Sequence, residues 1–251
     1  MGRRLGQHFL VRQSILERIA AAACQDAEER VVEVGPGRGA LTSYLVRLAR
    51  HVIAIEIDPV LAQYLRAKFR DEAGFELVEN DVLKVDLSAW GPVTIAGNLP
   101  YYITSPIIQR VLSLGPLLRR AVFLVQKEVA ERITAQPGTR EYGYLSVQTQ
   151  LQAEARILFP VSRSAFQPPP KVESAVIRLV PRPVMEVDDP GAFLQFASVC
   201  FRQKRKTLRN NLAGAYAKEL LDGISEGGMR AEQLSIARLA SIFQHLRKGG
   251  D

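Results

Sequence analysis

Short runs of β-branched and other apolar residues alternate along the chain with stretches in which apolar residues recur every three or four positions. The runs lie at Arg30–Val34, His51–Ile57, Phe75–Val78, Val93–Ala96 and Ala121–Val125. Helical spacing is seen in Leu41, Tyr44, Leu45 and Leu48, in Leu61, Tyr64, Leu65 and Phe69, in Ile107, Ile108, Val111 and Leu112, and in Val129–Ile133. Strands that alternate with helices predict a parallel sheet that is covered on both faces.

Two later runs, Ala153–Phe159 and Ser174–Val180, are predicted to pair as antiparallel strands at one edge of this sheet. The segment between them, Phe166–Lys171, has too many prolines to be a strand or a helix. Beyond Pro181 the strand pattern stops, and the later patterns are helical. The predicted domains are therefore residues 1–183 and residues 184–251.

Composition and charge narrow the class of protein. Of the 251 residues, 47% are hydrophobic and 24% charged, close to the average for soluble globular proteins. No apolar run is long enough to span a membrane, and the N-terminus lacks the apolar core of a signal peptide. Cys24 and Cys200 are predicted to be reduced thiols, so we expect a cytoplasmic protein. Lys and Arg outnumber Asp and Glu by 33 to 26, which favours a polyanionic partner.

Polar residues that can carry chemistry follow the predicted strands. In an open parallel sheet, ligands bind at the carboxyl ends of the strands, and the features at these ends are Gly35–Gly39, Glu56, Asp81 and Asn98. Glycines let the backbone turn tightly beside a ligand, and the following helix offers free N–H groups. Glu56 comes about 20 residues after the first glycine, where an acid binds ribose hydroxyls in such folds. The series predicts a nucleoside-binding site.

Two classes of cofactor are compatible with the glycine loop. The pattern Gly35-x-Gly37-x-x-Ala40 fits the dinucleotide fingerprint, so a nicotinamide-dependent oxidoreductase is one hypothesis. Glu33 and Asp81 place negative charge at the site, which favours S-adenosylmethionine, with its sulfonium and ammonium groups, over an anionic pyrophosphate. Each acid also has an ordinary interpretation, as a strand-end or surface charge for Glu33 and a helix N-cap for Asp81.

Asn98-Leu99-Pro100-Tyr101 ends the fourth strand and is compatible with either a turn or a base-binding element. An exocyclic adenine amine is a poor nucleophile because its lone pair is delocalised into the ring. The Asn98 side-chain oxygen and the Leu99 carbonyl would accept its two N–H groups, so that the lone pair points at a methyl donor. Pro100 would aim that carbonyl. Tyr101 and Phe166 would stack on the base, although core packing is an equal alternative for Phe166.

Longer motifs carry a resemblance to one family. They are Leu5-Gly6-Gln7-His8-Phe9-Leu10, Val32-Glu33-Val34-Gly35-Pro36-Gly37, Asn98-Leu99-Pro100-Tyr101, Gln126-Lys127-Glu128-Val129, Tyr142-Gly143-Tyr144-Leu145-Ser146-Val147 and the segment Phe166–Val176. With these motifs the chain resembles, nearly end to end, the bacterial small-subunit (16S) ribosomal RNA adenine dimethyltransferases, the kasugamycin-sensitivity family. The resemblance implies an α/β fold, a Rossmann-like class I methyltransferase domain with a mostly parallel sheet, and a small all-helical C-terminal domain.

The resemblance also implies an activity. S-adenosylmethionine would be the methyl donor, and two adjacent adenosines near the 3′ end of small-subunit rRNA would each be methylated twice on N6 during ribosome biogenesis. Cofactor contacts would come from His8, Leu10, Gly35, Gly37, Glu56, Asp81 and Asn98. The target base would lie between Tyr101 and Phe166, and His8 stands where the family motif often has Asn. We expect a monomer that acts on a 30S assembly particle, with no metal and no membrane.

A basic segment, Phe201–Leu212, resembles the basic helix of the same family. Its cations are Arg202, Lys204, Arg205, Lys206 and Arg209. In a helix, four of them (all but Lys204) would share one face, which predicts contact with RNA phosphates, although a solvated amphipathic face is the ordinary alternative. Two rival functions stay open. One is that of the related large-subunit rRNA methyltransferases of macrolide resistance, which the basic segment disfavours, and the other is a ribosome-assembly factor that mainly binds.

Overall fold

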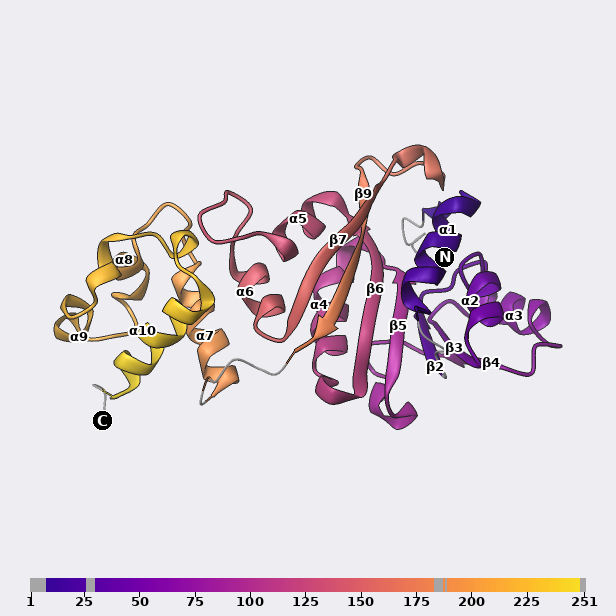
Figure 1. The fold of residues 1–251 in the computed structure, drawn as a ribbon, viewed down its shortest axis with the longest axis horizontal. Helices are drawn as coiled ribbons and strands as arrows, with labels where there is room; N and C mark the ends of the chain where they lie inside the picture. Colours follow the sequence, from indigo (N-terminus) through magenta and orange to yellow (C-terminus); the bar gives the residue numbers. More distant parts are fainter. Residues whose placement is uncertain (1–7, 26–29, 183–186, 188, 249–251) are drawn as a thin grey trace. The chain divides into compact units, whose positions relative to one another are not determined.

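The computed structural model describes residues 8–25, 30–182, 187 and 189–248 (Figure 1). The chain forms two compact units, of which the first comprises residues 1–130 and 153–181 and the second residues 131–152 and 182–251. The motif residues Leu5, Gly6 and Gln7, and the predicted boundary between residues 183 and 184, lie outside the described residues. Within the described ranges, no helix has the length and apolar character to cross a membrane.

A seven-stranded sheet organises the first unit (Figure 1). Its strands are β2 (Arg30–Val34), β3 (His51–Glu56), β4 (Phe75–Glu79), β5 (Val93–Asn98), β6 (Leu118–Gln126), β7 (Ala153–Val161) and β9 (Ser174–Pro181). They lie in the order β4-β3-β2-β5-β6-β9-β7; the first five are parallel, and β9 is antiparallel to both neighbours. The prediction of a parallel sheet with an antiparallel pair at one edge is confirmed. Strand order reverses between β2 and β5, which marks the carboxyl ends of these strands as the ligand-binding edge.

Helices cover this sheet through their apolar faces. Those of the first unit are α1 (Gln13–Ala23), α2 (Thr42–Leu48), α3 (Pro59–Lys68), α4 (Thr104–Leu112) and the start of α5 (Lys127–Thr134). Ile19 of α1 and Leu45 of α2 share one hydrophobic cluster with Val122 of β6 and side chains of its neighbouring strands. α3 begins where the Asp58 carboxylate accepts hydrogen bonds from the first backbone N–H groups of the helix. The helices therefore hold the loops at the carboxyl edge in fixed positions.

A two-stranded sheet ties the described start of the chain to the proline-rich segment. β1 (Phe9–Leu10) pairs antiparallel with β8 (Phe166–Gln167), and Leu10 lies opposite Phe166. Both side chains are buried in the cluster beneath α1 and α2. The prediction that the whole proline-rich segment forms no strand is wrong for its first two residues, because their partner is far away in the sequence and local composition does not reveal it.

The second unit has a hydrophobic cluster of its own. Its helices, beside the end of α5, are α6 (Tyr144–Gln150), α7 (Pro190–Cys200), α8 (Leu208–Leu212), α9 (Lys218–Asp222) and α10 (Ile236–Lys248). Val147 and Leu151 pack in this cluster with Phe193 and Phe243. The structure therefore differs from the predicted boundary, which left residues 131–152 in the first domain, because these residues pack against helices that come much later in the chain.

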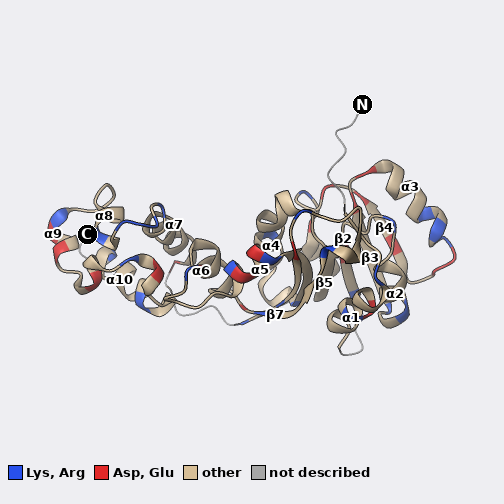
Figure 2. Ribbon diagram, turned by 90° about the horizontal axis from the view of Figure 1, so that it is seen from above, with Lys and Arg blue, Asp and Glu red and all other residues tan. Residues whose placement is uncertain are grey.

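The basic segment is not one helix. α7 ends at Cys200, and the connection that follows, residues 201–206, consists of turns and bends and is largely blue in Figure 2. Thr207 then begins α8, because its side chain accepts a hydrogen bond from the backbone N–H of Asn210 (3.4 Å). The prediction of a helix through all five cations is therefore wrong, and of the five only Arg209 lies in a helix.

Candidate active site

The glycine loop between β2 and α2 has the geometry that its sequence predicts. Gly35, Gly37 and Gly39 have φ angles of +67°, +59° and +72°, which residues with a Cβ rarely adopt. A Cβ on Gly37 would lie 3.1 Å from the ring of Phe9 in β1, and one on Gly39 would lie 2.6 Å from the ring of Phe69. Side chains therefore pack directly on this loop from two directions, and only glycine fits.

Glu56, at the end of β3, is hydrogen-bonded to the glycine loop. One carboxylate oxygen accepts a hydrogen bond from the N–H of Gly37 (3.1 Å), and the other accepts from the N–H groups of Ile57 and Asp58 (3.0 Å each). Burial raises the pKa of Glu56, while these three donors oppose that shift. The predicted ribose-binding acid is thus fixed against the glycine loop, with only 4% of its surface exposed.

Glu33, inside β2, is an interior acid. It is 1% exposed, which rules out the interpretation as a surface charge. Its carboxylate accepts a hydrogen bond of 2.6 Å from the hydroxyl of Thr42, the first residue of α2. Burial raises its pKa to about 7, the charge of Glu56 adds to this effect, and Thr42 and Lys68 oppose it. The site thus holds a buried carboxyl with a pKa near neutral pH.

Lys68 also contacts the glycine loop directly. Its ammonium group donates hydrogen bonds to the carbonyls of Arg38 and Gly39 (3.0 and 3.2 Å).

Asp81 lies half-buried beyond the end of β4. Its carboxylate accepts a hydrogen bond from the N–H of Leu83 (3.0 Å), which closes a turn over residues 82–84 and does not start the helix of the N-cap alternative. The preceding Asn80 donates its N–H to the carbonyl of Glu56 (3.0 Å) and so joins this loop to the previous one. The predicted contact of Asp81 with adenine stays a prediction.

Asn98 ends β5 beside the glycine loop. Gly97 lies so close to β2 that a Cβ there would be 2.4 Å from the carbonyl oxygen of Val34, and this brings the two strand ends together. The side-chain N–H₂ of Asn98 donates to the backbone carbonyl of His8 (3.1 Å). Because that bond uses the amide nitrogen, the side-chain oxygen is the end left to accept a substrate N–H. Leu99 is buried, and its N–H donates to the carbonyl of Leu124 (3.1 Å).

Tyr101 is held through its hydroxyl group and lies beside the ring of His8. Its hydroxyl shares a hydrogen bond of 2.8 Å with that of Ser174 on β9, and burial raises the pKa of the phenol. The imidazole of His8 is stacked near the ring, with centroids 6.2 Å apart, and also hydrogen-bonds the carbonyl of Pro168 (2.8 Å). Pro100, directly before Tyr101, has the φ that its ring requires (−61°) and an extended ψ of 126°. His8 therefore contacts both the predicted stacking residue, Tyr101, and the side-chain amide of Asn98.

Phe166 does not lie open to a substrate in this structure. Its side chain is 3% exposed and belongs to the cluster beneath α1 and α2, so the packing alternative describes it here. Leu10, 5% exposed, contributes to the same cluster.

Sequence reasoning did not identify Thr42, Lys68 or Ser174. A signal existed for Thr42, which opens the helix after the glycine loop, but not for Ser174, which reaches Tyr101 only through strand pairing.

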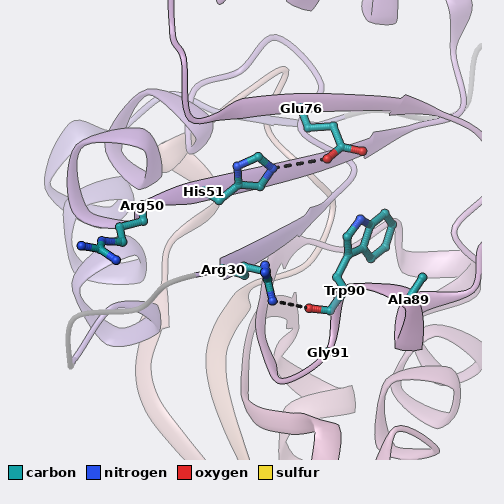
Figure 3. A pocket seen from close by; sticks show the side chains of 7 residues that line it. All are labelled: Arg30, Arg50, His51, Glu76, Ala89, Trp90 and Gly91. Carbon is teal, nitrogen blue, oxygen red and sulfur yellow. Dashed lines mark hydrogen bonds and ion pairs between the residues drawn. The ribbon is translucent and has the colours of Figure 1, made fainter.

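A separate hollow of about 720 Å³ lies at the amino ends of the parallel strands, away from the glycine loop (Figure 3). It is lined by Arg30, Arg50, His51, Glu76, Ala89, Trp90 and Gly91. Figure 3 shows the His51 imidazole paired with Glu76 (3.3 Å) and Arg30 donating to the carbonyl of Trp90 (2.9 Å). Arg30 and His51 begin their strands, so this hollow is at the amino ends. None of the predicted site residues lines it.

The strand order, the glycine loop and the Asn-Leu-Pro-Tyr strand end together define a Rossmann-like class I methyltransferase that uses S-adenosylmethionine. The buried carboxyl of Glu56 fits a cofactor with a ribose, and that of Glu33 favours a cationic cofactor over an anionic pyrophosphate. The profile of the ribosomal RNA adenine dimethylase family matches residues 2–248. The chain belongs to this family and is a ribosomal RNA adenine dimethyltransferase.

Individual relatives agree with this assignment. A ribosomal RNA small subunit methyltransferase A from Chlorobium luteolum is 40% identical over 247 residues, which cover 96% of this chain and 88% of the relative. A dimethyladenosine transferase from Plasmodium falciparum has a similar structure, with a TM-score of 0.82, 26% identity and coverage of 97% and 98%. The 23S rRNA methyltransferase ErmE has a TM-score of 0.75 at 31% identity, with coverage of 95% and 99%.

Proposed function

We propose that this enzyme methylates N6 of two adjacent adenosines near the 3′ end of small-subunit rRNA, twice each, in a 30S assembly particle in the cytoplasm. The observation that carries the chemistry is the hydrogen bond from the Asn98 amide nitrogen to the carbonyl of His8 (3.1 Å). It presents the amide oxygen as an acceptor at the carboxyl edge of the sheet. An adenine amine offers the donors that this acceptor requires.

The residues at the end of β5 provide two hydrogen-bond acceptors for the adenine amine. The Asn98 oxygen and the Leu99 carbonyl accept the two N–H groups and draw the nitrogen towards tetrahedral geometry, so that its lone pair is available for the methyl group. The cofactor supplies that methyl group on a positively charged sulfur. The proton then leaves to water, so no strong base is required and the rate gain comes from alignment and electrostatics.

The base itself is proposed to stack on Tyr101, whose ring the bond to Ser174 holds in place. Aromatic stacking contributes roughly 1–3 kcal/mol per base. Phe166 supports β1 from within the cluster in this structure, and a direct contact between its ring and the base requires the ring to leave that cluster. Tyr101 is therefore the stacking residue that the geometry favours.

The basic connection between α7 and α8 is proposed to bind RNA phosphates, and a monomer suffices for this arrangement. The choice of the small subunit is supported by the names of relatives such as that from Chlorobium luteolum. The likeness to ErmE supports a second candidate, methylation of large-subunit rRNA. The two candidates share the same chemistry and differ only in the RNA that docks.

One experiment separates these possibilities. Labelled methyl transfer is measured to unmethylated small-subunit particles, naked small-subunit rRNA and large subunits in parallel. We expect dimethyladenosine in the particles, and label in large subunits alone would refute the proposed substrate. An Asn98→Ala protein should bind the particles but methylate them about 100-fold or more slowly, whereas unchanged transfer by this variant would refute the role of Asn98. Sedimentation of the free enzyme tests the monomer.

A further inference from the structure

We propose that Asn211 is a positioning residue that shapes the RNA-binding loop, defined here as Arg202–Lys206. This inference rests on the proposed function, in which this loop contacts rRNA phosphates. Asn211 lies in α8 and is 9% exposed, so it does not itself reach RNA. Its side chain points its polar atoms at the loop backbone, which makes it the connection between the helix and the loop.

The hydrogen bonds of Asn211 match the loop atom by atom. Its side-chain oxygen accepts from the N–H of Gln203 (3.1 Å), and its side-chain nitrogen donates to the carbonyls of Gln203 (3.1 Å) and Lys206 (3.5 Å). Only an amide side chain offers one acceptor and two donors in this arrangement, and Asp lacks the donors. The N–H of Lys206 also donates to the carbonyl of Gln203 (3.0 Å), so the loop is a closed turn around a buried amide.

The five cations of the basic segment fall into two groups. The Lys204 ammonium lies 3.7 Å from the Glu232 carboxylate and also donates to the carbonyl of Arg140. The Arg209 guanidinium lies 3.1 Å from the Asp222 carboxylate. Both charges are therefore partly balanced within the protein, and both side chains hold neighbouring segments together.

The other three cations, Arg202, Arg205 and Lys206, form the second group, and all three are exposed. In the part of the chain that the structure describes, the side chains of all three have no ion pair or hydrogen bond. Arg205 and Lys206 lie in the turn that Asn211 closes, residues 203–206, and Arg202 directly precedes it. A phosphate backbone therefore meets charges that pair with no residue the structure describes, on a loop whose backbone is held in one arrangement, which reduces the loop entropy lost on binding.

The test is a double-mutant cycle on RNA binding by the full chain. The measured quantity is the slope of log K against log salt for binding to unmethylated small-subunit particles. Arg202→Gln/Arg205→Gln/Lys206→Gln should lower the magnitude of this slope by about 2 to 3, at roughly 0.7–0.9 for each phosphate contact. Asn211→Ala should lower it in the same direction, and should have little further effect in the triple variant, because both changes remove the same contacts.

Asn210→Ala is the matched control. Asn210 is the exposed neighbour of Asn211 in the same helix, and its replacement should leave the slope and the affinity unchanged. The variant Asn211→Asp keeps the acceptor for Gln203 but turns a carboxylate oxygen towards the carbonyls of Gln203 and Lys206, so its slope should fall at least as far as that of Asn211→Ala. S-adenosylmethionine affinity should be unchanged in all variants, since its residues lie in the first unit.

The outcomes separate the inference from the proposed function. An unchanged slope in the triple variant would refute RNA contact by this loop. A lowered slope in the triple variant, together with a wild-type slope in folded Asn211→Ala, would refute the positioning role alone. Hydrogen exchange of the Gln203 amide in the unmodified protein gives a readout that does not depend on any variant folding. Slow exchange is expected, and exchange at the rate of an exposed amide would overturn the inference.

Discussion

Replacement of Glu33 by Gln should change how the stability of the first unit depends on pH. Burial raises the pKa of Glu33 from an ordinary value of 4.5 to about 7. A carboxyl with a raised pKa in the folded state favours folding most below its unfolded pKa, and this contribution is lost as the pH rises through the folded pKa. Between pH 4.5 and 7 the wild-type protein should therefore lose stability that the neutral variant keeps. At about 1.4 kcal/mol per pH unit, the loss has an upper bound of about 3 kcal/mol.

The assay is urea unfolding followed by tryptophan fluorescence. Trp90 is the only tryptophan of the chain and lies in the first unit, so the signal reports on the unit that contains Glu33. The two proteins should be similar near pH 5, since Gln can accept the hydrogen bond from Thr42, and the variant should be more stable at pH 8. Glu72→Gln, at an exposed carboxylate of the same unit, is the control and should leave the pH dependence unchanged.

Two results would refute this reasoning. Stability curves of wild type and Glu33→Gln that run parallel from pH 5 to pH 8 would mean that burial does not hold the Glu33 proton. Calorimetric titration with S-adenosylmethionine near pH 7 tests the link to the cofactor. A cationic ligand beside Glu33 should drive its ionisation and, with a pKa of about 7, release up to about half a proton per molecule in the wild type but none from this residue in the variant. Equal proton release in both proteins would place the cation elsewhere.

Three further changes test the remaining contacts. Gly37→Ala forces a side chain into positive φ against the Phe9 ring and should lower stability by about 1–2 kcal/mol and weaken S-adenosylmethionine binding, as read by unfolding and calorimetry. Tyr101→Phe removes the hydrogen bond to Ser174 and should lower the free energy of unfolding by about 1 kcal/mol. Adding Ser174→Ala to this variant should have little further effect, because the bond is already lost. If the losses of the two single variants add up in the double variant, the bond is unimportant. Asn98→Ala should lower kcat about 100-fold or more in single-turnover methyl transfer.

Local patterns predicted the sheet and the edge where the site lies. The apolar runs that became β2 and β5 are buried on both faces, so their composition identified them without any tertiary information. The polar residues directly after these strands had to meet at one edge once the sheet was parallel. This is why the amino-acid sequence alone was enough to place the glycine loop, Glu56 and Asn98 together.

Features that depend on distant partners could not be predicted in the same way. The basic segment has helical spacing, but Thr207 starts a new helix and Asn211 holds the residues before it in a turn. Phe166 sits in a sequence that fits both stacking and packing, and its pairing with Leu10 decides for packing in this structure. Residues 131–152 precede two further strands of the sheet, yet their apolar side chains belong to the other unit.

In the proposed mechanism, the bond from the Asn98 amide nitrogen to the His8 carbonyl makes the residue directly before β1 part of what orients the Asn98 amide. An amide rotated by half a turn would present two N–H groups to the adenine amine and repel it. The His8 carbonyl opposes that rotation by about 1 kcal/mol, the ordinary net value of such a bond. Whenever β1 leaves β8, this preference is lost and the two orientations of the amide become comparable. In the proposed mechanism, the pairing of β1 with β8 therefore favours the amide orientation that accepts the adenine amine.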